Sequence, residues 1–182
     1  MATVIDGTTG VSQVQNAVVS PSKLTQPLTM ATALATTSGT SADYLSIPSW
    51  VNRITMSLNA VSTNGASNPQ VQLGSSAGFA VSGYNSRSVA LQNAATPAST
   101  SALTGFVIYS GTSANSLSGH VVLTRVSGNL WVCSHNANTP PDVTFLGSGI
   151  VTLPGTLDRV RLTTVNGTDT FDAGSINILL EG

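Results

Sequence analysis

Residues 51–60 alternate apolar and polar side chains one residue at a time. Ile54, Met56, Leu58 and Ala60 fall on one face of this segment, and polar residues fall on the other. A period of two is typical of a β-strand with one buried face. The sequence holds no convincing window with the 3.6-residue period of a helix. We therefore predict an all-β chain.

Further strand-like segments follow, with turn residues between them. They are residues 70–73, 103–109, 119–126, 130–134, 143–153, 157–165 and 175–180. Val71 and Leu73 are expected to point inward, segment 103–109 to be buried on both faces, and Ser127-Gly128-Asn129 to form a tight hairpin. Residues 85–101, rich in Ala, Ser and Thr, are expected to form a loop. About eight to ten strands at this spacing favour an antiparallel jelly-roll-like β-sandwich.

Charged side chains are scarce. The 182 residues include 6 Lys and Arg and 7 Asp and Glu, for a formal net charge of −1. The cations form no cluster that could neutralise phosphates, so we exclude nucleic-acid binding through a basic patch. No apolar run approaches the roughly 20 residues of a membrane span, so we expect no membrane insertion. The polar surface must come instead from 25 Ser and 24 Thr, and Thr also suits strands.

Residues 1–27 differ from the rest of the chain. Their apolar residues, Val4, Ile5, Val11 and Val14 among them, are too few to build a core. We therefore predict an extended N-terminal arm over residues 1–27 and a β-sandwich domain over residues 28–182. The first residues lack the basic and apolar regions of a signal peptide, so we expect the protein to stay in a cytoplasm unless lysis releases it.

Two patterns could carry catalysis. Gly74-Ser75-Ser76-Ala77-Gly78 matches the G-x-S-x-G nucleophile elbow, but a strand and not a helix is expected after it, so a turn is the better interpretation. Asp169 and Asp172 are the only close carboxylates, and their segment is more simply a turn with side-chain-to-backbone hydrogen bonds than a glycosidase or calcium site. We therefore predict no catalytic residues and no enzyme.

One pattern could bind a metal. Cys133 and His135 lie two residues apart, on one face of a predicted strand, and His120 could lie on its neighbour. Zinc needs a third and usually a fourth ligand, which the sequence does not complete, so a buried Cys133 with surface histidines is favoured. An ion bound by histidines around the symmetry axis of an oligomer stays an alternative. Cys133 is the only cysteine, so the chain forms no intramolecular disulfide. We predict no metal site and no cofactor.

Three aromatic residues, Trp50, Tyr84 and Trp131, are candidate platforms for stacking a sugar ring. The alternative, which we favour, is that they fill the core, since aromatic residues make up 5% of the chain. Binding of a host-surface glycan through them is therefore the weaker interpretation.

Several stretches resemble a domain of bacteriophage and prophage tail-fibre and other virion proteins. They are IPSWVNRITMSLNAVSTNGAS (47–67), VQLGSSAGFAVSGY (71–84), TGFVIY (104–109), SGHVVLTRVSGNLWVCSH (118–135) and LDRVRLTTVNGTDTFDAGSINILLE (157–181). The C-terminal stretch is the most specific. The opening residues 4–11, VIDGTTGV, are similar to the start of such proteins.

This resemblance implies a virion structural protein with a β-sandwich domain, commonly trimeric. We expect a short tail-fibre-like protein that is assembled into the virion in the host cytoplasm. Val4, Ile5, Val11 and Val14 would anchor the arm on capsid or tail subunits. The sequence has no coiled coil, collagen-like repeat or β-helix shaft, which keeps open a capsid decoration or head-fibre protein. A carbohydrate-binding receptor module is the further alternative, and a hydrolase is the least supported.

Overall fold

The computed structural model describes residues 27–182 except 94, 114 and 142. In this part of the chain every regular element is a β-strand and every strand pair is antiparallel, which confirms the all-β prediction. The strands are β1 (Leu28–Met30), β2 (Leu34–Ala35), β3 (Ser41–Leu45), β4 (Arg53–Thr63), β5 (Pro69–Ser75), β6 (Gly78–Phe79), β7 (Asn85–Gln92), β8 (Ala98–Ala102), β9 (Phe106–Val107), β10 (Leu117–Ser127), β11 (Leu130–Thr139), β12 (Val143–Thr152), β13 (Arg159–Thr164) and β14 (Phe171–Glu181).

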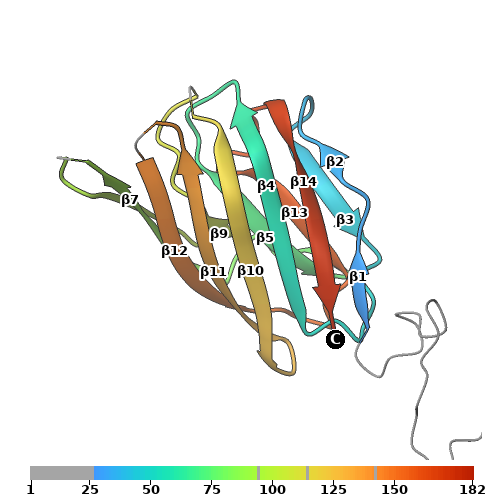
Figure 1. Cartoon of the computed structure of the whole chain (residues 1–182). Helices are drawn as coiled ribbons and strands as arrows, with labels where there is room; N and C mark the ends of the chain where they lie inside the picture. The colour runs from blue at the N-terminus through green and yellow to red at the C-terminus, as the bar shows by residue number, and fades with distance from the viewer. Residues whose placement is uncertain (1–26, 94, 114, 142) are drawn as a thin grey trace, which may run out of the picture.

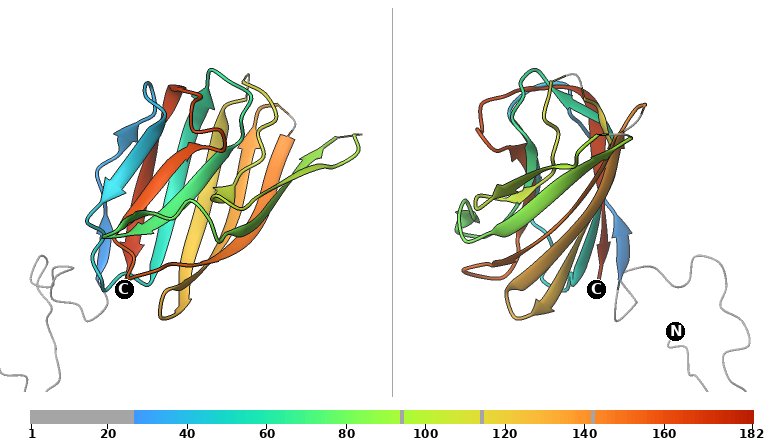
Figure 2. Two further views of the ribbon diagram at one scale, coloured as in Figure 1. Left: turned by 180° about the vertical axis from the view of Figure 1, so that it is seen from behind. Right: turned by 90° about the vertical axis from the view of Figure 1, so that its left-hand side faces the viewer.

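Two sheets pack face to face as a sandwich (Figure 1). The larger sheet has nine strands in the order β1-β14-β4-β10-β11-β12-β7-β8, with β2 also paired to β14. The smaller sheet has five strands in the order β3-β13-β5-β6, with β9 paired to β5. Figure 2 shows the two layers edge-on and the curvature of the larger sheet. The fold is thus an antiparallel sandwich of the expected jelly-roll-like class.

The core lies between the sheets and is filled by alternate residues of the central strands. Ile54, Met56 and Leu58 of β4 are buried, as their alternation predicted. Ala60 is exposed and has a φ of 50°, contrary to the prediction. The pairing of β4 with β10 shifts register at this level, so that Val61 takes the core-facing position instead.

The predicted C-terminal strand is longer than expected, and its alternation is confirmed. Ile176, Ile178 and Leu180 of β14 are buried and lie directly opposite the buried residues of β4. In the smaller sheet, every residue of β5 is buried. Val71 and Leu73 belong to the core, as predicted. The two-residue turn after Ser127 joins β10 to β11 as the expected hairpin.

Residues 85–101 do not form the predicted loop. They form most of an antiparallel hairpin, β7 with β8, and β7 continues the larger sheet beside β12. The prediction was wrong because Ala and Ser carry little intrinsic strand preference, and the neighbouring strand supplies the missing partner groups. The hairpin projects from one side of the sandwich (Figures 1 and 2).

The predicted strand 103–109 is confirmed only at its centre. β9 comprises Phe106–Val107, and Leu103 is 70% exposed. One edge of β9 pairs with β5, where Ile108 N donates to the Pro69 carbonyl at 2.8 Å. β9 therefore belongs to the smaller sheet, while its other edge faces the inner side of the larger one.

Side chains of the larger sheet form hydrogen bonds with the edge of β9 that faces this sheet. Val107 N and Tyr109 N donate to the hydroxyls of Ser86 and Ser88, each at 3.0 Å. The Val107 carbonyl accepts from Nε2 of His135 at 3.1 Å. These contacts explain why buried Ser side chains occur on β7, since a buried backbone N–H needs an acceptor. They also fix the position of the chain that leaves β9 at Tyr109.

The predicted arm, residues 1–27, lies outside the described residues except for Pro27. The carbonyl of Pro27 accepts from Gly182 N at 3.1 Å, so the described chain begins beside its C-terminus. The strands begin at Leu28, one residue after Pro27.

Candidate functional site

The proposed sugar-stacking aromatic residues are mostly in the core. Tyr84 is 2% exposed and Trp131 is 1% exposed, so neither ring can meet a sugar on the surface of this structure. The Tyr84 hydroxyl accepts from Leu73 N at 2.7 Å, and its ring meets that of Phe106 edge to face. Trp50 is partly buried against the core. The core interpretation is therefore correct for Tyr84 and Trp131.

The G-x-S-x-G motif lies in a hairpin. Ser75 pairs with Gly78 across the turn from β5 to β6, and Ser76 is exposed in that turn. No helix follows in the described chain, so the strand–turn–helix geometry of a nucleophile elbow is absent there. The turn interpretation is confirmed.

The metal-ligand candidates are separated by the sheet. Cys133 and His135 are both buried on the core side of β11, whereas His120 is exposed on β10. The prediction of a surface His135 was wrong, because its ring binds the edge of β9 inside the sandwich. Burial raises the pKa of the Cys133 thiol to about 12 and lowers that of His135 to about 4. Among the described residues, no group of three potential ligands comes together.

The acidic segment is a closed turn. Oδ1 of Asn166 accepts from the backbone N–H groups of Thr168 and Asp169 at 3.0 and 3.2 Å. Asp169 accepts from Ser67 N at 2.9 Å, and Asp172 accepts from the hydroxyl of Ser62. Hydrogen bonds from Asn166 and Ser67 lower the pKa of Asp169. Asp169 thus joins two loops through a side-chain-to-backbone hydrogen bond, as the turn interpretation predicted. Asp172 lies in β14, and its partner Ser62 lies in β4.

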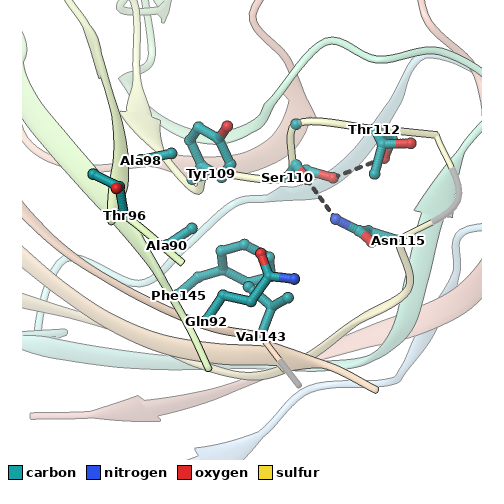
Figure 3. Close-up of a pocket in the computed structure, with 11 residues that line it drawn as sticks. Ala90, Gln92, Thr96, Ala98, Tyr109, Ser110, Thr112, Asn115, Val143 and Phe145 are labelled. Atoms are coloured by element: carbon teal, nitrogen blue, oxygen red, sulfur yellow. Dashed lines mark hydrogen bonds between the residues drawn. The ribbon is translucent and has the colours of Figure 1, made fainter. Parts of the chain in front are cut away.

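A hollow of about 270 Å³ lies where the β7–β8 hairpin, β12 and the chain after β9 meet. Figure 3 shows Tyr109 on one side and Phe145 on the other, with Gln92 and Val143 beside Phe145. The lining residues are Ala90, Gln92, Thr96, Ala98, Tyr109, Ser110, Gly111, Thr112, Asn115, Val143 and Phe145. None of them is charged. We call this the Tyr109 hollow.

The chain is held around the Tyr109 hollow by backbone contacts. Oδ1 of Asn68 accepts from Ser110 N at 2.8 Å and from Gly111 N at 3.1 Å. Gly111 has a φ of +73°, and a Cβ there would lie 2.9 Å from Cε1 of the Tyr109 ring. Glycine therefore permits both the turn and the close approach to the ring. The centroids of the Tyr109 and Phe145 rings lie 6.0 Å apart.

Several polar groups of the Tyr109 hollow have no partner within the described chain. The Tyr109 hydroxyl, the Thr96 hydroxyl and the Gln92 amide make no hydrogen bond there, and Nδ2 of Asn115 donates to the Ser110 carbonyl, leaving Oδ1 available. These groups can donate to or accept from a ligand. The hollow thus combines an apolar floor with uncommitted hydrogen-bonding groups.

A second hollow, of about 410 Å³, lies on the outer face of the smaller sheet. Its polar side chains are largely committed to one another. Gln70 binds the Thr164 carbonyl and the Thr104 hydroxyl, and Gln72 binds the Thr104 carbonyl. Arg161 forms two hydrogen bonds with Asp43, at 2.8 and 2.7 Å. These side chains already have hydrogen-bond partners without a ligand, so the Tyr109 hollow is the better candidate site.

Tyr109 was not identified from the sequence as a candidate site residue, because it follows an apolar run and was expected to belong to the core. The available signal was the polar segment directly after it, residues 110–116, which places Tyr109 at the point where the chain leaves the core.

Comparison with family models, curated proteins and solved structures finds no match to this chain. Within the described residues, no helix is long and apolar enough to span a bilayer.

Proposed function

We propose that the protein is a structural component of a bacteriophage virion, a short tail-fibre-like protein that is anchored by residues 1–27 and projects its sandwich towards the host surface. The resemblance to tail-fibre domains supports this proposal, because the resembling stretches supply most of both sheets. A surface solvated by Ser, Thr, Asn and Gln also leaves little charge to repel neighbouring copies in an assembly.

The observation that carries the proposal is the outer face of the larger sheet. β11 and β12 contain no Lys, Arg, Asp or Glu residue. Leu146 and Ile150 on the outer side of β12 are 36% and 41% exposed, and Val132 of β11 lies beside Ile150. β11 and β12 thus form an uncharged strip with exposed aliphatic groups, bordered by Arg87 of β7, which lies opposite Ser148. Such a strip favours packing against copies of the same chain. The number of copies in this proposal, three, comes from the resemblance, since domains of that kind are commonly trimeric.

The test localises the protein on particles and measures whether the purified chain competes with particles for binding to host cells. Antibodies raised against the purified chain should label the tail end of particles in electron micrographs, and the purified full chain should slow particle adsorption to host cells. An unrelated β-sandwich protein at the same concentration is the control. Labelling over the head would favour the decoration alternative, and the absence of the chain from purified particles would overturn the virion role.

A further inference from the structure

We propose that the Tyr109 hollow binds a single uncharged sugar residue. This inference rests on the proposed role in host attachment, because it names the chemistry that the sandwich would recognise on a cell surface. In this inference the partly exposed ring of Tyr109 is the stacking platform, in place of Trp131 and Tyr84, which are buried.

The floor of the hollow fits the apolar face of a sugar ring. The partly exposed ring of Tyr109 presents aromatic surface, and Ala98 and Val143 extend it with aliphatic groups. Phe145 is 1% exposed and supports this floor from inside the core. A pyranose has one face of C–H groups that packs against such surface. The loop contacts of Ser110 and Gly111 hold the Tyr109 backbone in place, so little ordering is needed when a ligand binds.

The rim of the hollow fits the hydroxyl groups of a sugar. The Gln92 amide and the Thr96 and Tyr109 hydroxyls each can donate and accept, and none has a partner in the described chain. Each sugar hydroxyl also donates and accepts. Amide and hydroxyl groups without partners, at the edge of an aromatic platform, therefore match a sugar better than they match a purely apolar ligand.

Charge and volume narrow the ligand class. No Lys, Arg, His, Asp or Glu occurs among the described residues that line the hollow, so an acidic sugar would find no counter-ion among them. The volume of about 270 Å³ lies just below the range of about 300–1,000 Å³ typical of sites for drug-sized ligands. One ring therefore fits, and the rest of a glycan would extend into solvent.

The experiment is an NMR titration of the purified full chain with uncharged monosaccharides, including hexoses, N-acetylhexosamines and a deoxyhexose, and with sialic acid as the charged comparison. We expect at least one neutral sugar to shift the backbone amides of Ala90, Tyr109 and Gly111. Tyr109→Ala and Gln92→Ala should each weaken the affinity about tenfold or more, whereas Asn93→Ala, an exposed amide on the same hairpin that does not line the hollow, should leave it unchanged.

Tyr109→Phe is a second variant that keeps the ring, and it should bind more weakly than the native chain but better than Tyr109→Ala. The inference is wrong if no neutral sugar binds at tens of millimolar, if sialic acid binds more tightly, or if Tyr109→Ala binds as well as the native chain. These failures are separate from failure of the proposed function. A chain that labels particles but binds no sugar overturns this inference alone, and a chain that binds sugar but is absent from particles overturns the virion role.

Discussion

Nε2 of His135 lies 3.1 Å from the carbonyl oxygen of Val107, and this hydrogen bond joins the two sheets of the sandwich. The ring fits because β12 has glycine opposite it, where a Cβ on Gly147 would lie 2.1 Å from the same Nε2. Nδ1 of His135 is buried and has no hydrogen-bond partner in the described structure. The neutral ring, with its proton on Nε2, is therefore the form that this site stabilises.

His135 should make the fold sensitive to acid. Burial lowers its pKa from 6.5 to about 4, so between these values the unfolded chain binds a proton that the folded chain does not. Stability should therefore fall as the pH drops from 6.5, by up to on the order of 3 kcal/mol at pH 4. Denaturant unfolding across this range measures the effect. His135→Gln, which can still donate to Val107, should lose this part of the pH dependence, and His120→Gln should keep it.

Gly147→Ala should destabilise the sandwich. The added methyl group would lie 2.1 Å from Nε2 of His135 and 2.6 Å from the Arg87 carbonyl oxygen, so the backbone of β7 or the ring must move. Overpacking of this kind typically costs about 1–3 kcal/mol. Gly155→Ala is the control, since its Cβ would come no closer than 3.3 Å to Cβ of Ser75. Equal unfolding midpoints for the two variants would contradict the tight packing around His135.

Tyr84→Phe should cost about 1–3 kcal/mol of unfolding free energy, because it removes the acceptor of a buried backbone N–H, that of Leu73. Tyr109→Phe is the matched control, since the Tyr109 hydroxyl has no partner in the described chain, and it should unfold at nearly the native midpoint. Thermal unfolding followed by circular dichroism compares the two. A stable Tyr84→Phe variant would mean that the hydroxyl contributes little to the core.

The sequence predicted the strands that are buried on one face and exposed on the other, because Ile54, Met56 and Leu58 record that geometry in a local pattern. It did not predict β7 and β8, whose Ser and Ala residues are specified by contacts with distant strands. His135 could have been placed in the core, since it shares a strand face with Cys133, which was expected to be buried. Its partner, Val107, lies 28 residues away, and no local pattern records such a contact.

The Tyr109 hollow could not be predicted from the sequence for the same reason. Its lining comes from the β7–β8 hairpin, the loop after β9 and the start of β12, which are separated along the chain. Residue types alone made Trp50, Tyr84 and Trp131 the better candidates. In the fold, the chain leaves the core after β9, so Tyr109 is partly exposed, whereas Tyr84 is buried.

Ile150→Asp should dissociate the proposed trimer without unfolding the subunit. Ile150 is 41% exposed on the outer face of the larger sheet, and a charge there would be costly only when a second copy covers it. Val165→Asp is the matched control, because Val165 is 42% exposed and lies beyond the end of β13 in the smaller sheet. Sedimentation equilibrium should give about three chains for the native protein and the control, and one for Ile150→Asp. A native mass of 18.4 kDa would refute the trimer.

Deletion of residues 2–27 should separate assembly from folding. All of the described strands lie in residues 28–181, so the truncated chain should keep its unfolding midpoint and its oligomeric state. The proposed anchors Val4, Ile5, Val11 and Val14 are removed, and the protein should then fail to join particles. Complementation of a particle-producing strain with either form, followed by immunoblotting of purified particles, measures incorporation. A variant with Val4, Ile5, Val11 and Val14 changed to Ser tests the side chains themselves and should also be lost from particles. Normal incorporation of both variants would place the attachment surface on the sandwich.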